Sequence, residues 1–239
     1  KDKSKVSDLI QFCSRDSSKV QSLFAIVHYL GLDGFQDEHL EPFNNVFPRI
    51  SLNQIPKTVI QLNLTANEFN TIDFSKFTNL EVLYLIDAKG LTAAQFNALP
   101  VNIKASMEIL DLTSTNVTNF DFSGFTHLKD LCLSGIKGLT ATQFNTISSE
   151  AKASIEILNL EAKAFIKTFE IDSVDVTGFD FSELTNLKHL NLSGVRGLTA
   201  EQFNAIPEKS KASIERLYLR SVDVADFDFS GFTGKIIRE

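Results

Sequence analysis

The side chains that most often act as nucleophiles or general bases are few in this chain and scattered along it. Its 239 residues include two cysteines and four histidines: Cys13, Cys132, His28, His39, His127 and His189. A nucleophile must lie within hydrogen-bond reach of its base. The strand assignment below places Cys132 and His189 two strands apart, which is roughly 10 Å at ordinary strand spacing. The sequence therefore predicts no nucleophile–base pair, and we do not expect an enzyme.

Metal and cofactor sites are not predicted either. The two cysteines form neither a zinc-ligand spacing nor a disulfide framework, and the sequence has no glycine-rich phosphate-binding motif. A recurring Phe-Asp-Phe string supplies Asp121, Asp180 and Asp228. An aspartate that returns with each repeat is typical of turn capping rather than catalysis. We expect no cofactor and no bound metal.

Composition and charge exclude several classes of partner. The formal net charge is −7 and the isoelectric point is about 5.2, whereas nucleic-acid binding needs a basic surface. An acidic chain is not attracted to anionic lipid, and no apolar run reaches the 18 residues that a membrane span requires. Hydrophobic residues make up 43% of the chain, which is enough for a substantial core.

The sequence leaves the compartment open. Free thiols favour a reducing compartment, whereas sequons at Asn63, Asn116 and Asn191 would accept glycans in a secreted protein. Such sequons also arise by chance in repeats rich in asparagine and threonine. The chain starts at Lys1 without a signal peptide, which leaves room for a leader that was removed or left out.

An internal repeat provides the elements that would position any functional side chain. The string LTAAQFNALP at Leu91 returns as LTATQFNTIS at Leu139 and as LTAEQFNAIP at Leu198. A second string, NFDFSGFTHLKDLCL, returns as GFDFSELTNLKHLNL and DFDFSGFTG. Self-similarity at a fixed period is typical of a solenoid, in which each unit buries its apolar face against its neighbours.

Seven copies of an L-x-x-L-x-L motif predict seven short strands, because alternating leucines point to one face of a strand. Successive middle leucines are separated by 21, 27, 21, 27, 32 and 27 residues, so short and long units alternate. The separation of 32 is a short unit with an 11-residue insertion at 162–172. The copies are Val59/Leu62/Leu64, Leu80/Leu83/Leu85, Met107/Leu110/Leu112, Leu128/Leu131/Leu133, Ile155/Leu158/Leu160, Leu187/Leu190/Leu192 and Ile214/Leu217/Leu219.

Each long unit also predicts a helix that begins with a capping box. Pro100 and Pro207 are expected to help stop the first and third of these helices. The short units have no room for a full helix, and phenylalanines such as Phe120, Phe122 and Phe125 predict a 3₁₀ or extended return. The capping pairs, each followed by an inward phenylalanine, are Thr92/Gln95 with Phe96, Thr140/Gln143 with Phe144, and Thr199/Gln202 with Phe203.

The seven motifs in phase resemble the leucine-rich repeat family over roughly residues 55–233. The resemblance implies an α/β solenoid, a right-handed horseshoe with a parallel β-sheet on its concave side, and a role in protein–protein recognition. The consensus asparagine of the family is kept only at Asn67, so we expect apolar packing to replace its buried asparagine ladder. The equivalent positions hold Ala88, Thr115, Ile136, Val195 and Val222.

Three segments follow from this pattern. Residues 1–50 do not repeat and are expected to form a helical N-terminal cap, or alternatively an adaptor module that recruits a second protein. Residues 51–233 are expected to form the solenoid, and residues 234–239 a tail that is either a short cap or a truncation. An uncapped last strand would leave an edge that can pair with another copy, so a structural or self-assembling surface protein is a further hypothesis.

The residues between the motif leucines are expected to form a partner-binding surface on the concave face. They mix tyrosines, β-branched residues and charges, with acidic residues in the middle and arginines toward the C-terminus, and tyrosine is enriched at interface hot spots. The alternative is an ordinary exposed sheet face. The predicted set is Tyr84, Ile86, Ile109, Asp111, Asp130, Cys132, Ile157, Asn159, Glu161, His189, Asn191, Arg216, Tyr218 and Arg220.

The insertion at 162–172 is a second candidate for a partner contact, because insertions in repeat arrays often map to the binding face. Its Phe165 and Phe169, with two isoleucines, make it too apolar for a solvated loop. We expect it either to fold back as a hairpin or to contact a partner. The leading hypothesis is a non-enzymatic scaffold that binds a protein partner, whose identity the pattern does not specify.

Overall fold

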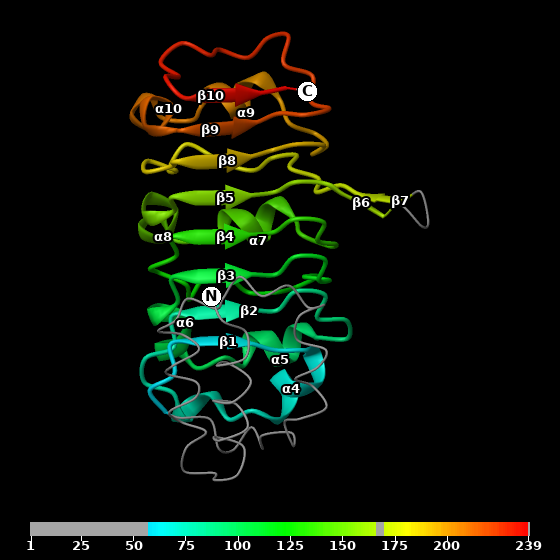
Figure 1. Cartoon of the computed structure of the whole chain (residues 1–239), viewed down its shortest axis with the longest axis vertical. Coiled ribbons are helices and arrows are strands. Elements are labelled where there is room, and N and C mark those ends of the chain that lie inside the picture. Colours follow the sequence, from blue (N-terminus) through cyan, green and yellow to red (C-terminus); the bar gives the residue numbers. More distant parts are fainter. Residues whose placement is uncertain (1–56, 166–169, 239) are drawn as a thin grey trace, which may run out of the picture. The chain divides into compact units, whose positions relative to one another are not determined.

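The computed structural model describes residues 57–165 and 170–238, which belong to one compact unit of the chain. The helical segment expected at residues 1–50 lies outside the described residues, as do His28, His39 and Cys13. Within the described part, the chain repeats one arrangement of a short parallel strand followed by a return segment (Figure 1).

Eight three-residue strands form a single parallel sheet in the described part of the chain. Strands that follow one another along the repeat are neighbours in the sheet, and the sheet is open because β1 and β10 are its edges (Figure 1). All seven predicted strands are confirmed. The strands of this sheet are β1 (Gln61–Asn63), β2 (Val82–Tyr84), β3 (Ile109–Asp111), β4 (Asp130–Cys132), β5 (Ile157–Asn159), β8 (His189–Asn191), β9 (Arg216–Tyr218) and β10 (Lys235–Ile237).

The middle residue of each strand sets the register of the sheet. The aligned middle residues of the first seven strands are Leu62, Leu83, Leu110, Leu131, Leu158, Leu190 and Leu217. From Leu83 to Leu217 these side chains are 0% exposed, and they form one continuous apolar row. A slip of one residue would turn a strand's leucines toward the other face, which explains why leucine spacing in the sequence predicts the register.

Each long unit contains two short helices, one more than the sequence predicted. The three capping boxes are confirmed, with the threonine hydroxyl and the glutamine side chain each accepting the other residue's backbone N–H. Pro100 and Pro207 follow the first helix and occupy the N-cap of the second. The helices are α4 (Ala66–Thr71) in the first unit, then α5 (Ala93–Asn97), α6 (Val101–Ser106), α7 (Ala141–Asn145), α8 (Ser149–Ser154), α9 (Ala200–Asn204) and α10 (Glu208–Ser213).

Phenylalanine fills the core of the short units. Phe120 is 2% exposed and stacks on Phe96 of the preceding long unit, with ring centroids 4.2 Å apart. The later short units return through turns, as predicted. The first short unit has the 3₁₀ helix η2 (Phe74–Lys76) but also the capped helix α4, so the expectation that short units have no room for a helix is wrong there. The predicted turn-capping role of the aspartates is confirmed, since Asp121 accepts the Ser123 N–H at 2.9 Å. Equivalent stacks join Phe144 with Phe179 (4.4 Å) and Phe203 with Phe227 (4.3 Å).

Hydrogen bonds, as well as apolar packing, take over the role expected of the asparagine ladder. Thr115, at the consensus position, is 1% exposed. Its hydroxyl donates to the Leu85 carbonyl (2.7 Å) and accepts the Ala88 N–H (3.2 Å). The expectation of purely apolar packing is therefore wrong at this position, because a hydroxyl can satisfy buried backbone groups that a methyl cannot.

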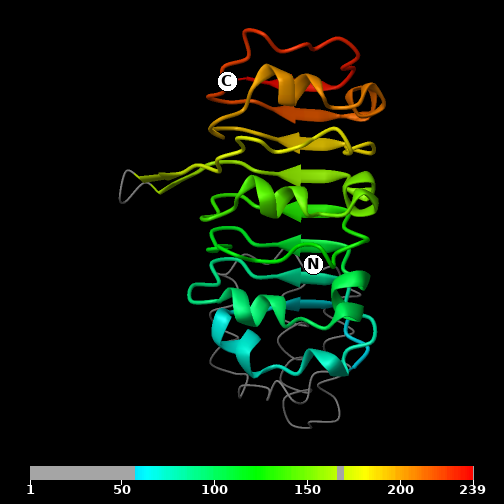
Figure 2. The ribbon, with the colours of Figure 1, turned by 180° about the vertical axis from the view of Figure 1, so that it is seen from behind.

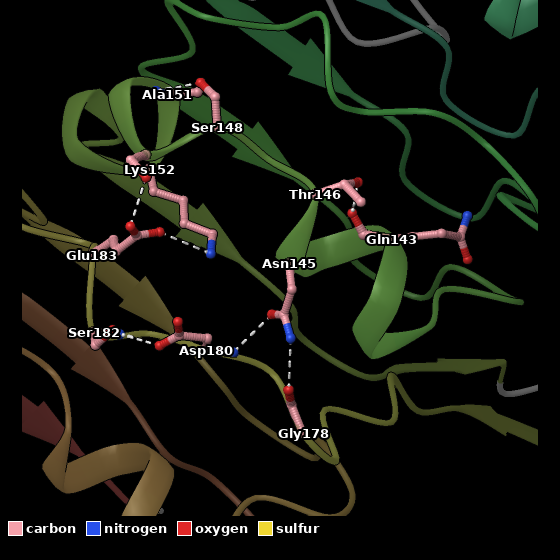
Figure 3. Close-up of polar contacts among 11 residues, drawn as sticks. Gln143, Asn145, Thr146, Ser148, Ala151, Lys152, Gly178, Asp180, Ser182 and Glu183 are labelled. Carbon is pink, nitrogen blue, oxygen red and sulfur yellow. Dashed lines mark hydrogen bonds and ion pairs between the residues drawn. The ribbon is translucent and has the colours of Figure 1, made fainter.

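An asparagine at the end of the first helix in each long unit joins that unit to the next. Asn145 donates to the Gly178 carbonyl (3.0 Å) and accepts the Asp180 N–H (2.9 Å), as Figure 3 shows. Asn97 and Asn204 make the equivalent pairs of bonds. These exposed amides clamp the turn of the following short unit onto the helix.

Residues 235–237, which the sequence pattern placed in a tail, form the eighth strand, β10. Ile236 pairs with Leu217 and so occupies the middle position. The segment from Phe232 to Ile236 is two residues shorter than the equivalent segment from Phe125 to Leu131. This shortening draws the backbone close to the preceding unit. A Cβ on Gly234 would lie 2.1 Å from the Ile214 carbonyl oxygen, so only glycine fits there. Pairing of this edge with another copy stays a prediction.

The insertion forms an antiparallel hairpin of β6 (Lys163–Phe165) and β7 (Glu170–Asp172). Figures 1 and 2 both show it projecting away from the sheet rather than folding back onto it. The hairpin is confirmed, and its contact with a partner stays a prediction. Phe169 lies outside the described residues.

Candidate partner-binding face

The first and third residues of the strands point away from the leucine row and form what we call the open face of the sheet. Figure 1 looks onto this face, and Figure 2 shows α5, α7 and α9 on the opposite side of the sheet. Most side chains of the open face are half-buried, whereas Asn63, Arg216 and Lys235 are exposed.

The register brings the sequence-predicted residues together in two adjacent columns, with neighbouring strands about 4.8 Å apart. Ile86, Glu161 and Arg220 follow the ends of their strands. The column of first positions contains Ile109, Asp130, Ile157, His189 and Arg216. The column of third positions contains Tyr84, Asp111, Cys132, Asn159, Asn191 and Tyr218.

Among the carboxyl groups of the open face, Asp130 has the pKa that lies furthest from its ordinary value. Its neighbours in register are Ile109 and Ile157, which keep water from both sides of it. Burial raises the pKa of Asp130 to about 6; the negative charge of Asp111 adds to the rise, and His189 opposes it. A half-buried carboxylate between apolar residues is unfavourable unless it is paired. A cationic or hydrogen-bond-donating group of a ligand placed over Asp130 would therefore pair with the carboxylate and stabilise its charged form.

Cys132 and His189 do not form a catalytic pair. Burial raises the pKa of the Cys132 thiol, Asp111 adds to the rise, and its sulfur lies 3.2 Å from the Thr113 hydroxyl. A reactive cysteine needs the opposite shift, because the thiolate is the nucleophile. His189 lies on β8, where its Nε2 is 3.6 Å from a carboxylate oxygen of Glu215. The described surroundings of Cys132 therefore do not match those of an activated nucleophile.

Three polar residues of the third column are held in place by their own strands. Asp111, Asn159 and Asn191 each accept the backbone N–H two residues further on, at 2.8, 3.0 and 3.1 Å. The Asn191 amide also donates to a Glu161 carboxylate oxygen at 3.2 Å. Side chains fixed in this way lose little conformational freedom on binding, which favours affinity.

Sequence reasoning missed a set of buried charges on the second helices. Lys104, Lys152 and Lys211 are 5%, 2% and 3% exposed, and a recurring Lys-Ala-Ser string was the available signal. Because each ammonium faces a carboxylate of the following unit, these lysines join units and do not form a binding site. The partners are Asp121 (3.8 Å), Glu183 (3.2 Å, Figure 3) and Asp228 (3.8 Å).

Across residues 57–165 and 170–238, no group of three or more His, Cys, Asp or Glu side chains could hold a metal ion. None of the helices in these ranges has the length and apolarity to span a bilayer. Comparison with protein-family models and with curated proteins finds no match. The functional assignment of the open face therefore rests on its geometry and chemistry.

Proposed function

We propose that this chain is a leucine-rich repeat solenoid that binds a protein partner through the open face. The supporting features are a strand in every repeat, a leucine row in register and a single parallel sheet that each unit extends. Stacked repeats present an extended surface because every unit adds one strand to the same face. Such a surface suits recognition of a macromolecule better than enclosure of a small substrate.

The observation that carries this proposal is the mixture of side chains that the register places on one face of the sheet. Among the described residues, Ile109 and Ile157 are half-buried, Ile86 is 43% exposed, and Tyr84 and Tyr218 stand in the third column. Interface centres combine aromatic and aliphatic side chains with a polar rim. A sheet face that only meets water would carry polar residues at these positions.

The charges of the open face also indicate the partner's complementary surface. Asp111, Asp130 and Glu161 lie on or just after β3 to β5, whereas Arg216 lies on β9 and Arg220 just after it. A partner with basic groups opposite the middle strands and acidic groups opposite β9 would match this pattern. Because complementary charges mainly accelerate association, we expect the association rate to fall as salt rises. A rate independent of salt would contradict this part of the proposal.

Affinity capture from native extract with matched baits tests the proposal. One bait is the wild-type chain, and the second carries Tyr84→Ala, Ile109→Ala and His189→Ala. A third bait carries Val101→Ala, Glu150→Ala and Glu208→Ala, which change exposed residues of α6, α8 and α10. We expect a protein that the first and third baits retain and the second does not.

Two readouts make the result decisive. Thermal unfolding of the three baits must agree, because a destabilised second bait would lose binding for a trivial reason. Equal recovery on the second and third baits would contradict binding by the open face. Direct titration of the captured protein against each bait then gives the change in Kd, and we expect a loss of tenfold or more, about 1.4 kcal/mol, for the open-face variant alone.

A further inference from the structure

The open face carries two groups of charges of opposite sign on different strands. In the acidic group, burial and then the negative charge of Asp111, on β3, raise the pKa of Asp130, on β4. In the basic group, Arg216 on β9 and Lys235 on β10 are register partners, and both are exposed. Like charges held close together repel, so each group favours an opposite charge from a partner.

The register fixes the distance between the two groups. Because β4, β5, β8 and β9 are consecutive neighbours in the sheet (Figure 1), three strand steps separate Asp130 from Arg216 in the column of first positions. At about 4.8 Å a step, these residues lie about 14 Å apart along the face. Ile157 and His189, both half-buried, lie between them. A matching partner must offer a basic and an acidic group at this spacing.

The open face is narrow because each strand contributes only three residues. Three residues span about 10 Å at roughly 3.3 Å a residue, which is close to the diameter of one α-helix with its side chains, about 10–12 Å. One turn of a helix rises about 5.4 Å, and neighbouring strands lie about 4.8 Å apart. A single helix lying along the columns would therefore place about one turn over each strand.

An extended segment fits this face less well than a helix. The backbone groups of the inner strands are already paired with neighbouring strands, so an extended chain lying across them would find few partners for its own N–H and C=O groups. Over Ile109 and Ile157 those groups would also lose water, and an unpaired buried backbone group is costly. A helix satisfies its backbone groups internally.

We propose that the open face receives one α-helix of the protein partner, with a basic side chain over Asp130 and an acidic side chain over Arg216 and Lys235. This inference rests on the proposed protein-binding function and specifies the chemistry of the partner. Three helical turns, or about eleven residues, span about 16 Å and return to the same side of a helix. Long side chains can bridge the difference from about 14 Å. The two charged residues of the helix should therefore lie about eleven positions apart, with apolar residues between them over Ile157.

Selection from two displayed libraries tests this inference without knowledge of the partner. One library randomises an exposed face of one helix in a stable helical scaffold, and the other randomises a linear, unstructured segment of the same length. The bait is the full chain, and clones that also bind a bait with Asp130→Asn, Arg216→Gln and Lys235→Gln are removed. We expect binders from the helical library, enriched in one basic and one acidic residue about eleven positions apart.

Other selection results would overturn the inference. Binders from the linear library, recovered alone or as often as helical ones, would show that the face accepts extended chains, whose two charges would lie about four residues apart. Helical binders without the expected charge spacing would contradict the charge assignment. A helical library that yields no binder would contradict the helix itself.

An exchange of charges makes the test specific. For a selected helix, Arg216→Glu should weaken binding about tenfold, and replacing the acidic residue of the helix with lysine should restore most of the affinity. Arg196→Glu is the matched control, because Arg196 is exposed and lies outside the columns of the open face. Equal losses in the two variants, or no recovery with the exchanged helix, would also overturn the inference.

The outcomes separate this inference from the proposed function. A protein captured through the open face would leave the proposed function standing even if the selection failed, and only the helix would be lost. Conversely, if no protein were captured, selected helices with the expected charge spacing would still support the recognition chemistry of the face.

Discussion

At the scale of single residues, Asp130 shows how the open face departs from an ordinary solvated sheet. Ile109 and Ile157 flank it in register, and its pKa of about 6 lies above the ordinary value of 3.8. The folded protein therefore holds this proton more tightly than the unfolded chain does. Its contribution to stability is most favourable at low pH and is lost as the pH rises from about 4 through about 6.

We therefore expect Asp130→Asn to stabilise the protein above pH 6. The pKa shift, discounted for the partial exposure of the carboxyl, corresponds to a gain of about 1–2 kcal/mol at pH 8 and almost none at pH 4. Denaturant unfolding of the wild type and the variant at these two pH values measures the difference. Because Asp130 lies on the proposed binding face, the variant should also bind the partner more weakly.

Asp121 supplies the control of opposite sign. Hydrogen bonds from Ser123 lower the pKa of Asp121, so its carboxylate stabilises the fold above the unfolded pKa, and that contribution is lost as the pH falls. Asp121→Asn should lower the unfolding free energy at pH 8 and have less effect at low pH. If Asp130→Asn changed stability in the same direction as Asp121→Asn at pH 8, the account of Asp130 would be wrong.

At the scale of elements, side chains at helix ends make some of the contacts between successive units. Asn145→Ala removes both bonds between α7 and the next short unit, to Gly178 and Asp180. We expect a loss of about 1–3 kcal/mol, since each net hydrogen bond contributes about 0.5–1.5 kcal/mol. Equilibrium unfolding measures the loss, and hydrogen exchange should show faster exchange of the Asp180 amide.

Thr142→Ala on the same helix is the matched control for Asn145→Ala. Thr142 is exposed, and alanine has the higher helix propensity, so this variant should be as stable as the wild type or slightly more stable. Equal losses in the two variants would show that α7 itself, rather than the clamp, had been damaged.

The elements that could be predicted from the sequence are those whose residues are fixed by burial. The leucine row predicts the seven strands and their register because a slip would expose it. The capping boxes predict the starts of α5, α7 and α9 because both partners are local in sequence. The core of the fold is therefore visible in the periodicity alone.

β10 and the second helices of the long units were not predicted, for separate reasons. β10 was missed because the last return is two residues short and Ile236 replaces leucine. The second helices carry buried lysines, whose burial depends on carboxylates in the next unit. Once the strands were known, the positions of the two columns of the open face could be predicted. The function of these columns could not be predicted, because packing does not determine which residues lie on a surface.

At the scale of the whole molecule, the leucine row makes the stability of each unit depend on its neighbours. In a stacked array, stability is the sum of the units' own contributions and their nearest-neighbour interfaces. A defect at a middle strand weakens two interfaces, whereas a defect at an edge strand of the sheet weakens one. Leu158, on β5, lies between Leu131 and Leu190, whereas among the described residues Leu62, on β1, pairs only with Leu83.

We therefore expect Leu158→Ala and Leu62→Ala to differ although the chemical change is the same. Leu158 is 0% exposed, and its truncation should cost about 2–5 kcal/mol and accelerate hydrogen exchange in the units on both sides. Leu62 is 7% exposed, and its loss should be smaller and confined to exchange near β1. Equal losses with equally widespread exchange would mean that the described sheet unfolds as a single cooperative unit, with no nearest-neighbour hierarchy. The open face would then form or vanish as a whole, and partner binding would report global stability instead of local strand order.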